Sequence, residues 1–460
     1  MTPEFIDRKE ELSFLEQKYE SDEFELLLIY GRRRIGKTEL IKRFIEDKTS
    51  IYCLASLEDK EKQLENITTK IHGYFGGIKP DVQRWTDLFE YFSKKAQKKT
   101  VLVIDEFPYL VEENKSIPSY FQKFVDEYLK DKDLILILCG SSISMMEDLM
   151  SYKNPLYGRR SGQIDLRSFS FKEARKIIPE TDLEESIRYY SVFGGVPFYL
   201  QKLDGPTLEK DIKEKVCRNT EILYEEPHIL LRQEFRKPNR YFSIMESIAS
   251  GKTTPKAISD DTKIPLQSIS KYLKELQRIR LIRHEIPITA RKKSSRRGVY
   301  RIEDNFFDFW FHFIGPHLSD VEEGRKGFVE DYVMTDLDKY VGKKFENICM
   351  EFLKEELKHD FRFTKIGRWW YREEEIDIVA LNEKEDQIYL GECKWSKNKV
   401  GLDLLKNLKD KAKEVRWRVK NREETYALFS RSGFTNDLVS YAEEKDELAL
   451  YSLEDMEKRV

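Results

Sequence analysis

The chain has 460 residues, a length typical of about three domains, and 36% of its residues are charged. Its 81 basic and 84 acidic side chains leave a formal charge of −3, so any nucleic-acid surface must be local. Residues 1–12 contain no apolar signal region, and no apolar run is long enough to span a bilayer. The five cysteines form no Cys-x-x-Cys pair and fit no zinc pattern. We therefore expect a cytoplasmic protein with reduced thiols and no membrane partner.

Residues 24–40, FELLLIYGRRRIGKTEL, predict a buried strand, a turn and a helix. From Gly31 to Thr38 the turn matches G-x-x-x-x-G-K-[ST], a loop whose backbone N–H groups wrap around phosphate oxygens. In this pattern Lys37 is expected to reach the β- and γ-phosphates of ATP, and Thr38 to coordinate Mg²⁺. The predicted nucleotide-binding residues are Gly31, Arg32, Arg33, Arg34, Ile35, Gly36, Lys37, Thr38 and Glu39.

A second acidic element follows the apolar run Thr100–Ile104, which is typical of a buried parallel strand. Asp105 and Glu106 come directly after it, at the carboxyl end where open α/β sheets bind their ligands. We expect Asp105 to hold Mg²⁺ through water and Glu106 to polarise the attacking water. A further predicted strand, DLILILCGSS, ends in Ser141 and Ser142, either of which could begin the next helix as its N-cap.

Six motifs in order resemble the archaeal ATPase family, a branch of the AAA+/STAND P-loop NTPases, over roughly residues 3–320. They are FIDRKEEL at 5–12, GRRRIGKT, LVIDEFPYL, CGSS, LYGRR, and FGGVPFYL at 193–200. The resemblance implies ATP hydrolysis coupled to a conformational change. It also implies that Phe5, Ile6 and Arg8 frame the adenine, and that Gly195 and Pro197 belong to a lid over the base.

The same resemblance suggests roles for three further polar residues. Ser141 would sense the γ-phosphate. Arg159 or Arg160 would act as an arginine finger on a neighbouring subunit, which implies a homo-oligomer. For the two arginines, a surface pair unrelated to phosphate is an equally strong interpretation.

Residues 236–303 predict three helices followed by two strands with a basic turn, the order of a winged helix. Such a module can place its third helix in the major groove of DNA and its wing on the backbone. The alternative is a protein-docking module with a solvated turn. The expected nucleic-acid contacts are Lys271, Lys274, Arg291, Lys292, Lys293, Arg296 and Arg297.

Near the C-terminus, the run IYLGECKWSK places Glu392 and Lys394 on the same face of a predicted strand, with Cys393 on the other. Asp377 lies on the preceding predicted strand, and Glu346 on an earlier helix. Residues 335–435 read as αβββαβ and resemble the PD-(D/E)XK nuclease fold. The resemblance implies that Glu346, Asp377 and Glu392 bind Mg²⁺ or Mn²⁺ and that Lys394 serves the attacking water. An inactive relic with a structural ion pair is the alternative.

The predicted fold class is therefore α/β: an AAA+-like P-loop ATPase with a helical lid, a winged helix and a PD-(D/E)XK nuclease-like domain. The expected segments are 1–167 (ATPase core), 168–235 (lid), 236–303 (winged helix), 304–334 (helical linker) and 335–460 (nuclease-like domain). The predicted function is ATP-regulated DNA binding and processing with metal-dependent cleavage. The alternative is a STAND-type ATP switch whose C-terminal domain only binds nucleic acid or protein.

Overall fold

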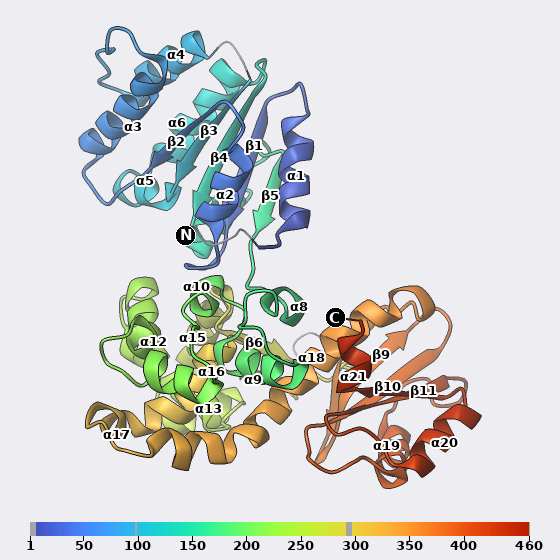
Figure 1. Ribbon diagram of the computed structural model, residues 1–460. Helices are drawn as coiled ribbons and strands as arrows, with labels where there is room; N and C mark the ends of the chain where they lie inside the picture. Colours follow the sequence, from blue (N-terminus) through green and yellow to red (C-terminus); the bar gives the residue numbers. More distant parts are fainter. Residues whose placement is uncertain (1–5, 97–98, 291–296, 460) are drawn as a thin grey trace. The chain divides into compact units, whose positions relative to one another are not determined.

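Two units make up the chain: residues 1–168 form the first and residues 169–460 the second (Figure 1). The computed structural model describes residues 6–96, 99–290 and 297–459. None of the described helices combines the length and the apolar character that crossing a bilayer requires.

The first unit is built on a five-stranded parallel sheet in the order β2-β3-β4-β1-β5. The strands are β1 (Glu25–Tyr30), β2 (Ser50–Leu54), β3 (Thr100–Asp105), β4 (Leu134–Gly140) and β5 (Gly162–Asp165). Every residue of β1, β3 and β4 is buried, which explains why these strands are continuous apolar runs in the sequence. The buried strands predicted before Gly31 and before Glu106 are thus confirmed.

Helices cover both faces of this sheet. Leu15 of α1 and Phe44 of α2 pack on one face with Leu27 and Ile29 of β1. The opposite face, to which Leu28 contributes, is covered mainly by α3 to α7. The helices are α1 (Lys9–Tyr19), α2 (Lys37–Ile45), α3 (Lys60–Phe75), α4 (Trp85–Lys95), α5 (Phe107–Glu113), α6 (Ile117–Phe124) with η1 (Val125–Leu129), and α7 (Ile143–Leu149).

The second unit begins with a helical stretch. Its helices are α8 (Phe171–Ala174), α9 (Leu183–Phe193), α10 (Pro197–Leu200), α11 (Leu208–Asp211), η2 (Ile212–Val216), α12 (Ile222–Glu234), α13 (Pro238–Ala249), α14 (Pro255–Thr262) and α15 (Leu266–Arg278). An antiparallel hairpin of β6 (Ile282–Glu285) and β7 (Val299–Ile302) follows α15. The three helices and two strands expected over 236–303 are therefore present.

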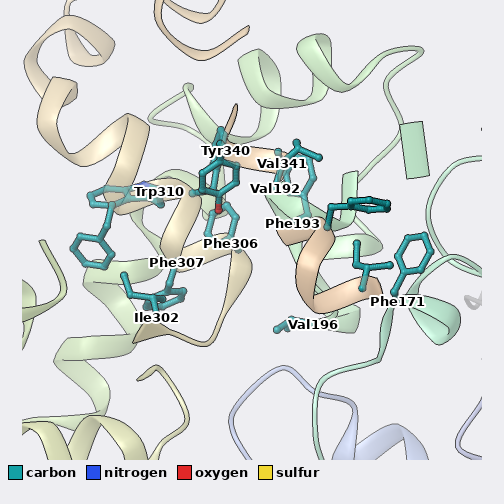
Figure 2. Close-up of a cluster of buried hydrophobic side chains, with 14 of the residues drawn as sticks. Phe171, Val192, Phe193, Val196, Ile302, Phe306, Phe307, Trp310, Tyr340 and Val341 are labelled. Carbon is teal, nitrogen blue, oxygen red and sulfur yellow. The ribbon is translucent and has the colours of Figure 1, made fainter. Parts of the chain in front are cut away.

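An aromatic segment after the hairpin forms the centre of this part of the core (Figure 2). Phe306, Phe309, Trp310 and Phe313 are all buried, as their helical spacing predicts. The Trp310 indole N–H donates to the carbonyl oxygen of Tyr224, which satisfies its buried polar group. The helices here are α16 (Asn305–Phe309), η3 (Trp310–Ile314), η4 (Gly315–His317), α17 (Leu318–Glu322) and η5 (Val329–Met334).

A mixed five-stranded sheet, in the order β12-β11-β10-β9-β8, forms the C-terminal part. The strands are β8 (Lys365–Tyr371), β9 (Glu374–Asn382), β10 (Gln387–Lys394), β11 (Glu423–Ser430) and β12 (Leu448–Ser452). The long helix α18 (Thr335–Asp360) packs on one face, and α19 (Leu402–Glu414) and α20 (Asn436–Glu444) on the other. The predicted αβββαβ order is observed, and β12 and α21 (Leu453–Glu457) extend it.

Candidate functional sites

The loop after β1 depends on a close approach of its backbone to Leu166, the residue that follows β5. Gly31 has φ +154°, and a Cβ there would lie 2.3 Å from the carbonyl oxygen of Leu166. Gly36 has φ +89° directly before the first turn of α2. Both glycines are therefore required by the path of the chain, and the loop presents the N-terminus of α2.

Lys37 lies folded over this loop. Its Nζ donates to the carbonyl oxygens of Gly31 and Arg32 at 2.9 and 3.0 Å, and the side chain is buried. Burial lowers the pKa of Lys37, an effect that the nearby carboxylates of Glu106 and Asp105 oppose. The ammonium thus sits among carbonyl oxygens at the point where the pattern predicts phosphate.

Asp105 is the centre of a buried hydrogen-bond group at the end of β3. Its Oδ2 accepts from the Thr38 hydroxyl at 3.0 Å and also from the Tyr52 hydroxyl, and its Oδ1 accepts from the Glu106 backbone N–H. Burial, followed by the hydrogen bond to Asp105, raises the pKa of Tyr52, which keeps its hydroxyl a donor. The predicted pair Thr38 and Asp105 is thus brought together, with Tyr52 as a third member.

Glu106 connects the ends of β3 and β4. Its Oε2 accepts from the Ser141 hydroxyl at 2.8 Å and from the Ser141 backbone N–H at 3.2 Å. Glu106 has φ +52°, an uncommon conformation for a residue with a side chain and one that often marks functional sites. Ser142 occupies the N-cap position of α7 without a side-chain cap bond, so the two serines have different surroundings.

Arg8 ties the segment before α1 to the loop. Its guanidinium donates to the carbonyl oxygens of Ile35 (3.2 Å) and Arg167 (2.6 Å). Arg33 donates to the Tyr109 hydroxyl at 3.0 Å, whereas Glu39 is exposed and pairs with Lys42. Arg32 is buried, and Ile6 and Arg34 are partly buried. Phe5 lies outside the described residues.

The two adjacent arginines after α7 differ in their surroundings. Arg159 binds Asp126 with two hydrogen bonds of 2.8 and 2.9 Å, an ion pair within its own unit. Arg160 is exposed and contacts Gln163. Arg159 therefore fits the interpretation as a surface ion pair unrelated to phosphate. Arg160 stays the candidate for the predicted arginine finger.

Gly195 and Pro197 lie in the second unit. A Cβ at Gly195 would lie 1.9 Å from the carbonyl oxygen of Phe169, whose backbone N–H donates to Gly195. Pro197 is buried at the first position of α10. Packing therefore explains why a glycine and a proline occupy these positions. Their role in a lid over the base stays a prediction.

A second group of polar residues lies where β9 and β10 stop pairing. The last paired residues are Ile378 and Gly391, and Asp377 and Glu392 come one step further in the same register. Asp377 Oδ2 accepts from the Cys393 backbone N–H at 2.9 Å. Both carboxylates are buried, so the strand pairing brings these two predicted residues to the same end of the sheet.

Cations of the protein itself contact the carboxylates. Glu392 Oε1 accepts from Lys394 at 3.3 Å and from Lys411 of α19 at 3.0 Å. Glu346 accepts from the buried Arg368, with Nη2 at 2.9 Å. The second oxygen of Glu392, Oε2, is buried and has no hydrogen-bond partner among the described residues. That oxygen can therefore accept a hydrogen bond or bind a cation.

The pKa of Asp377 is shifted by its burial and by the carboxylates nearby. Burial raises the pKa of Asp377 well above its ordinary value, and the neighbouring carboxylates Glu346 and Glu392 raise it further. Burial also raises the pKa of Glu346, against the lowering effect of Arg368. Among the described residues, no three acidic, histidine or cysteine side chains are close enough to form a ready metal site. The three predicted ligands are neighbours, but their oxygens do not converge on one point.

Of the seven predicted DNA-contacting residues, the structure describes three, two on α15 and one just before β7. Lys271 and Lys274 are exposed on α15, opposite its buried residues Ile269 and Leu273. Arg297 lies over the ring of Tyr371 of β8, with its guanidinium carbon 5.7 Å from the ring centre. The other four predicted cations of the turn, Arg291, Lys292, Lys293 and Arg296, lie outside the described residues.

Three residues of these sites were not predicted from the sequence. Tyr52 ends up beside Asp105 because β2 pairs with β3. Lys411 belongs to a helix whose sequence predicts an amphipathic helix with its lysines on the solvated face. Arg368, in the run IGRWWY, was the most detectable, because a lone cation in an apolar strand requires a buried partner.

We predict that Asp377→Asn makes the protein more stable in the absence of divalent metal. The amide oxygen can still accept from Cys393, while the repulsion from Glu346 and Glu392 is removed. Because the folded pKa is raised, the wild type loses stability as the pH rises above the ordinary value of 3.8. The melting temperature of the variant should exceed that of the wild type by a few degrees at pH 8, and the two should agree near pH 4. An equal or lower melting temperature at pH 8 would contradict the prediction.

Comparisons with known proteins agree with the first of these sites. A family profile described as an ATPase domain predominantly from Archaea matches residues 5–203. This confirms the resemblance of the N-terminal motifs, over a shorter stretch than expected. A second profile, DUF234, described as archaeal and bacterial proteins of unknown function, matches residues 310–423.

Comparison with solved structures found similarity to the following two proteins, among others. The Walker-type ATPase PABY2304 of Pyrococcus abyssi gives a TM-score of 0.49 at 20% identity, covering 67% of this chain and 96% of that one. The ORC2 protein of Aeropyrum pernix, in ADPNP–ADP complexes, gives 0.42 at 13% identity, covering 70% and 96%.

Relatives of this chain from Methanocaldococcus jannaschii include the following two proteins. The uncharacterized ATP-binding protein MJ0423 is 53% identical over 53 residues, which are 11% of this chain and 90% of that protein. The uncharacterized protein MJECL04 is 39% identical over 398 residues, which are 85% of this chain and 87% of that protein. The chain therefore belongs to the same family as MJECL04 and joins an archaeal ATPase domain to a C-terminal DUF234 domain.

Proposed function

We propose that the protein binds and hydrolyses ATP and uses this reaction to regulate the binding and cleavage of DNA. The hydrogen-bonded group of Thr38, Asp105 and Glu106 next to the Gly31–Gly36 loop is the observation that carries the ATPase part. The family match over residues 5–203 supports it.

In this proposal the backbone N–H groups of the loop hold the phosphates, and Lys37 turns from its carbonyl partners toward them. Thr38 and Asp105 fit a Mg²⁺ site, because a hydroxyl and a carboxylate oxygen already lie 3.0 Å apart. Bound Mg²⁺ would neutralise charge on the phosphate oxygens. Tyr52 keeps Asp105 oriented, which makes it a positioning residue.

Glu106 orients and polarises the attacking water in this proposal. One oxygen of its carboxylate, Oε2, is hydrogen-bonded to Ser141 in the structure. Ser141, which could turn toward the γ-phosphate, would then link nucleotide binding to the release of Glu106. Arg160 is proposed as the finger between subunits, since Arg159 is paired with Asp126.

DNA binding is assigned to helices α13 to α15 and the β6–β7 hairpin, whose order suits a winged helix. Lys271 and Lys274 would face the DNA from α15, and Arg297 would contact its backbone beside the basic turn. The turn is anchored rather than free at its base. The backbone N–H of Ile288 donates to the carbonyl oxygen of Arg368 on β8, and the Trp370 indole donates to the carbonyl oxygen of Arg297.

Phosphodiester cleavage is assigned to the β9–β10 end of the C-terminal sheet, as in a PD-(D/E)XK nuclease. Asp377, Glu392 and Glu346 would have to turn their oxygens toward one point to hold Mg²⁺ or Mn²⁺. The buried Glu392 Oε2, which has no hydrogen-bond partner among the described residues, supports this assignment. Such a metal ion would activate water and bind a phosphate oxygen. Lys394, which is partly exposed beside Glu392, would hold or deprotonate that water.

A second candidate function is a STAND-type ATP switch whose C-terminal domain has no cleavage activity. The observation in its favour is that Arg368 and Lys411 already neutralise Glu346 and Glu392. In this case the carboxylates are structural partners, and the domain only binds nucleic acid or protein.

We expect Lys37→Ala to abolish ATP hydrolysis, because the phosphates lose their cation. Glu106→Gln should still bind ATP but hydrolyse it roughly 100-fold or more slowly. The control is Glu113→Gln, an exposed position at the far end of α5, the helix that begins directly after Glu106. The measurements are steady-state turnover and a nucleotide-binding assay. Wild-type turnover in Glu106→Gln would exclude the water-polarising role.

Tyr52→Phe should raise the Mg²⁺ concentration needed for half-maximal ATP hydrolysis by roughly tenfold, since Asp105 loses a partner that orients it. ATP binding without Mg²⁺ should not change. Tyr120→Phe, in which the lost hydroxyl has no partner among the described residues, is the matched control. If both variants respond to Mg²⁺ as the wild type does, Tyr52 does not position Asp105.

Lys394→Ala should abolish the cleavage of plasmid or branched DNA by Mn²⁺-loaded protein, while metal and DNA remain bound, because lysine is not a metal ligand. The exposed Lys397→Ala should cleave as the wild type does. ATP hydrolysis measured without DNA should survive both changes. A wild-type protein that never nicks DNA with any divalent metal would instead support the switch.

A further inference from the structure

A cleft of about 300 Å³ lies in the second unit, between the β6–β7 hairpin and helix α18. Arg283 and Arg301 line it from the hairpin, Lys339 and Lys343 from α18, and Arg368 from β8. Glu346, one of the proposed metal ligands, also lines it. The cleft therefore begins beside the proposed DNA-binding module and reaches the proposed cleavage site.

The side chains that line the cleft, which include the exposed acid Asp336, carry a net positive charge. Six cationic and four acidic side chains line it. Four of the cations are held by carboxylates: Arg283 and Arg301 by Glu285, Arg368 by Glu285 and Glu346, and Lys344 by Asp308. Lys339 and Lys343 are exposed one turn apart on α18, and among the described residues neither has an acidic partner. These two ammonium groups are thus available to phosphates.

A partly buried ion cluster links the walls of the cleft. Arg283, Arg301 and Arg368 bind the carboxylate of Glu285 at 2.6, 2.8 and 3.1 Å. Burial alone would raise the pKa of Glu285, but the three guanidinium groups hold it below its ordinary value. The cluster joins the hairpin to β8. A ligand in the cleft would therefore meet a surface that is already organised.

One aromatic ring at the cleft can receive a base. His312 is exposed, and its ring centre lies 5.6 Å from that of Tyr340, at an interplanar angle of 33°. Both residues line the cleft. A cationic groove with stacking rings is the usual arrangement for single-stranded nucleic acid.

We infer that this cleft binds one strand of nucleic acid, with phosphates on Lys339 and Lys343 and a base on His312, and leads it toward Glu346. The inference rests on the proposed function and names the form of substrate that reaches the cleavage site. A volume of about 300 Å³ suits roughly one nucleotide at a time and excludes a duplex. Duplex binding is assigned to α15 and the hairpin turn.

The test is the affinity of the full-length protein for labelled oligothymidine, measured by fluorescence anisotropy without ATP. Lys339→Glu with Lys343→Glu should weaken single-strand binding at least tenfold. It should also lower the log–log salt slope by about 1.4, since each single-strand phosphate contact contributes about 0.7. Affinity for a duplex of equal length should not change.

Lys384→Glu with Lys420→Glu is the matched control, because it changes the net charge equally. Both control residues are exposed at the opposite end of the C-terminal sheet from Glu392. If the control weakens single-strand binding as much as the cleft variant, the effect is general charge repulsion and the inference is wrong. A wild type that binds duplex DNA but not oligothymidine also overturns it, while leaving the proposed function intact.

A third variant, His312→Ala, tests the stacking contact separately from the phosphate contacts. Loss of stacking should weaken oligothymidine binding about fivefold or more without changing the salt slope. An unchanged affinity overturns the proposed stacking contact. Complete displacement of oligothymidine by thymidine monophosphate at similar concentrations would show a mononucleotide site and overturn the strand proposal. If the wild type binds neither DNA form, the inference and the DNA-binding part of the proposed function fail together.

Discussion

Backbone pairing between neighbouring strands is the constraint on which both candidate sites depend. In the first unit β1, β4 and β3 are parallel neighbours, so the Gly31–Gly36 loop, Ser141 and Asp105 emerge at one edge of the sheet. In the C-terminal sheet the antiparallel register of β9 and β10 does the same for Asp377 and Glu392. Neither group is close in sequence, and the hydrogen-bonded ladders alone set their separation.

In both sites, buried charged groups are stabilised by hydrogen bonds and ion pairs from the chain itself. A buried ionised group is unfavourable unless it is paired or hydrogen-bonded, and each site supplies partners from its own chain. Lys37 donates to loop carbonyls, Asp105 accepts from Thr38 and Tyr52, and Glu392 accepts from two lysines. In the proposed function, a bound phosphate or metal ion would replace the contacts of Lys37 with the loop carbonyls and those of Glu392 with its lysines.

In the second unit, Arg368 links two different elements, because it contacts a carboxylate on each of them. It joins Glu285 of the hairpin to Glu346 of α18, and so connects the proposed DNA-binding module to the proposed cleavage site. The backbone bond from Ile288 to Arg368 strengthens the same junction. Glu285 and Glu346 are therefore linked through a single side chain.

The sequence by itself determined the elements and many of the chemical groups. The apolar runs ending in Gly31 and Asp105, and the spacing of Phe306 to Phe313, depend on local periodicity, which needs no knowledge of distant contacts. The αβββαβ order could be read for the same reason. The tertiary structure decided which partners the charged residues take. Tyr52, Arg368 and Lys411 meet their carboxylates only through strand pairing and helix packing, and Arg159 is drawn to Asp126. Such contacts join residues tens of positions apart, so no local pattern in the chain records them.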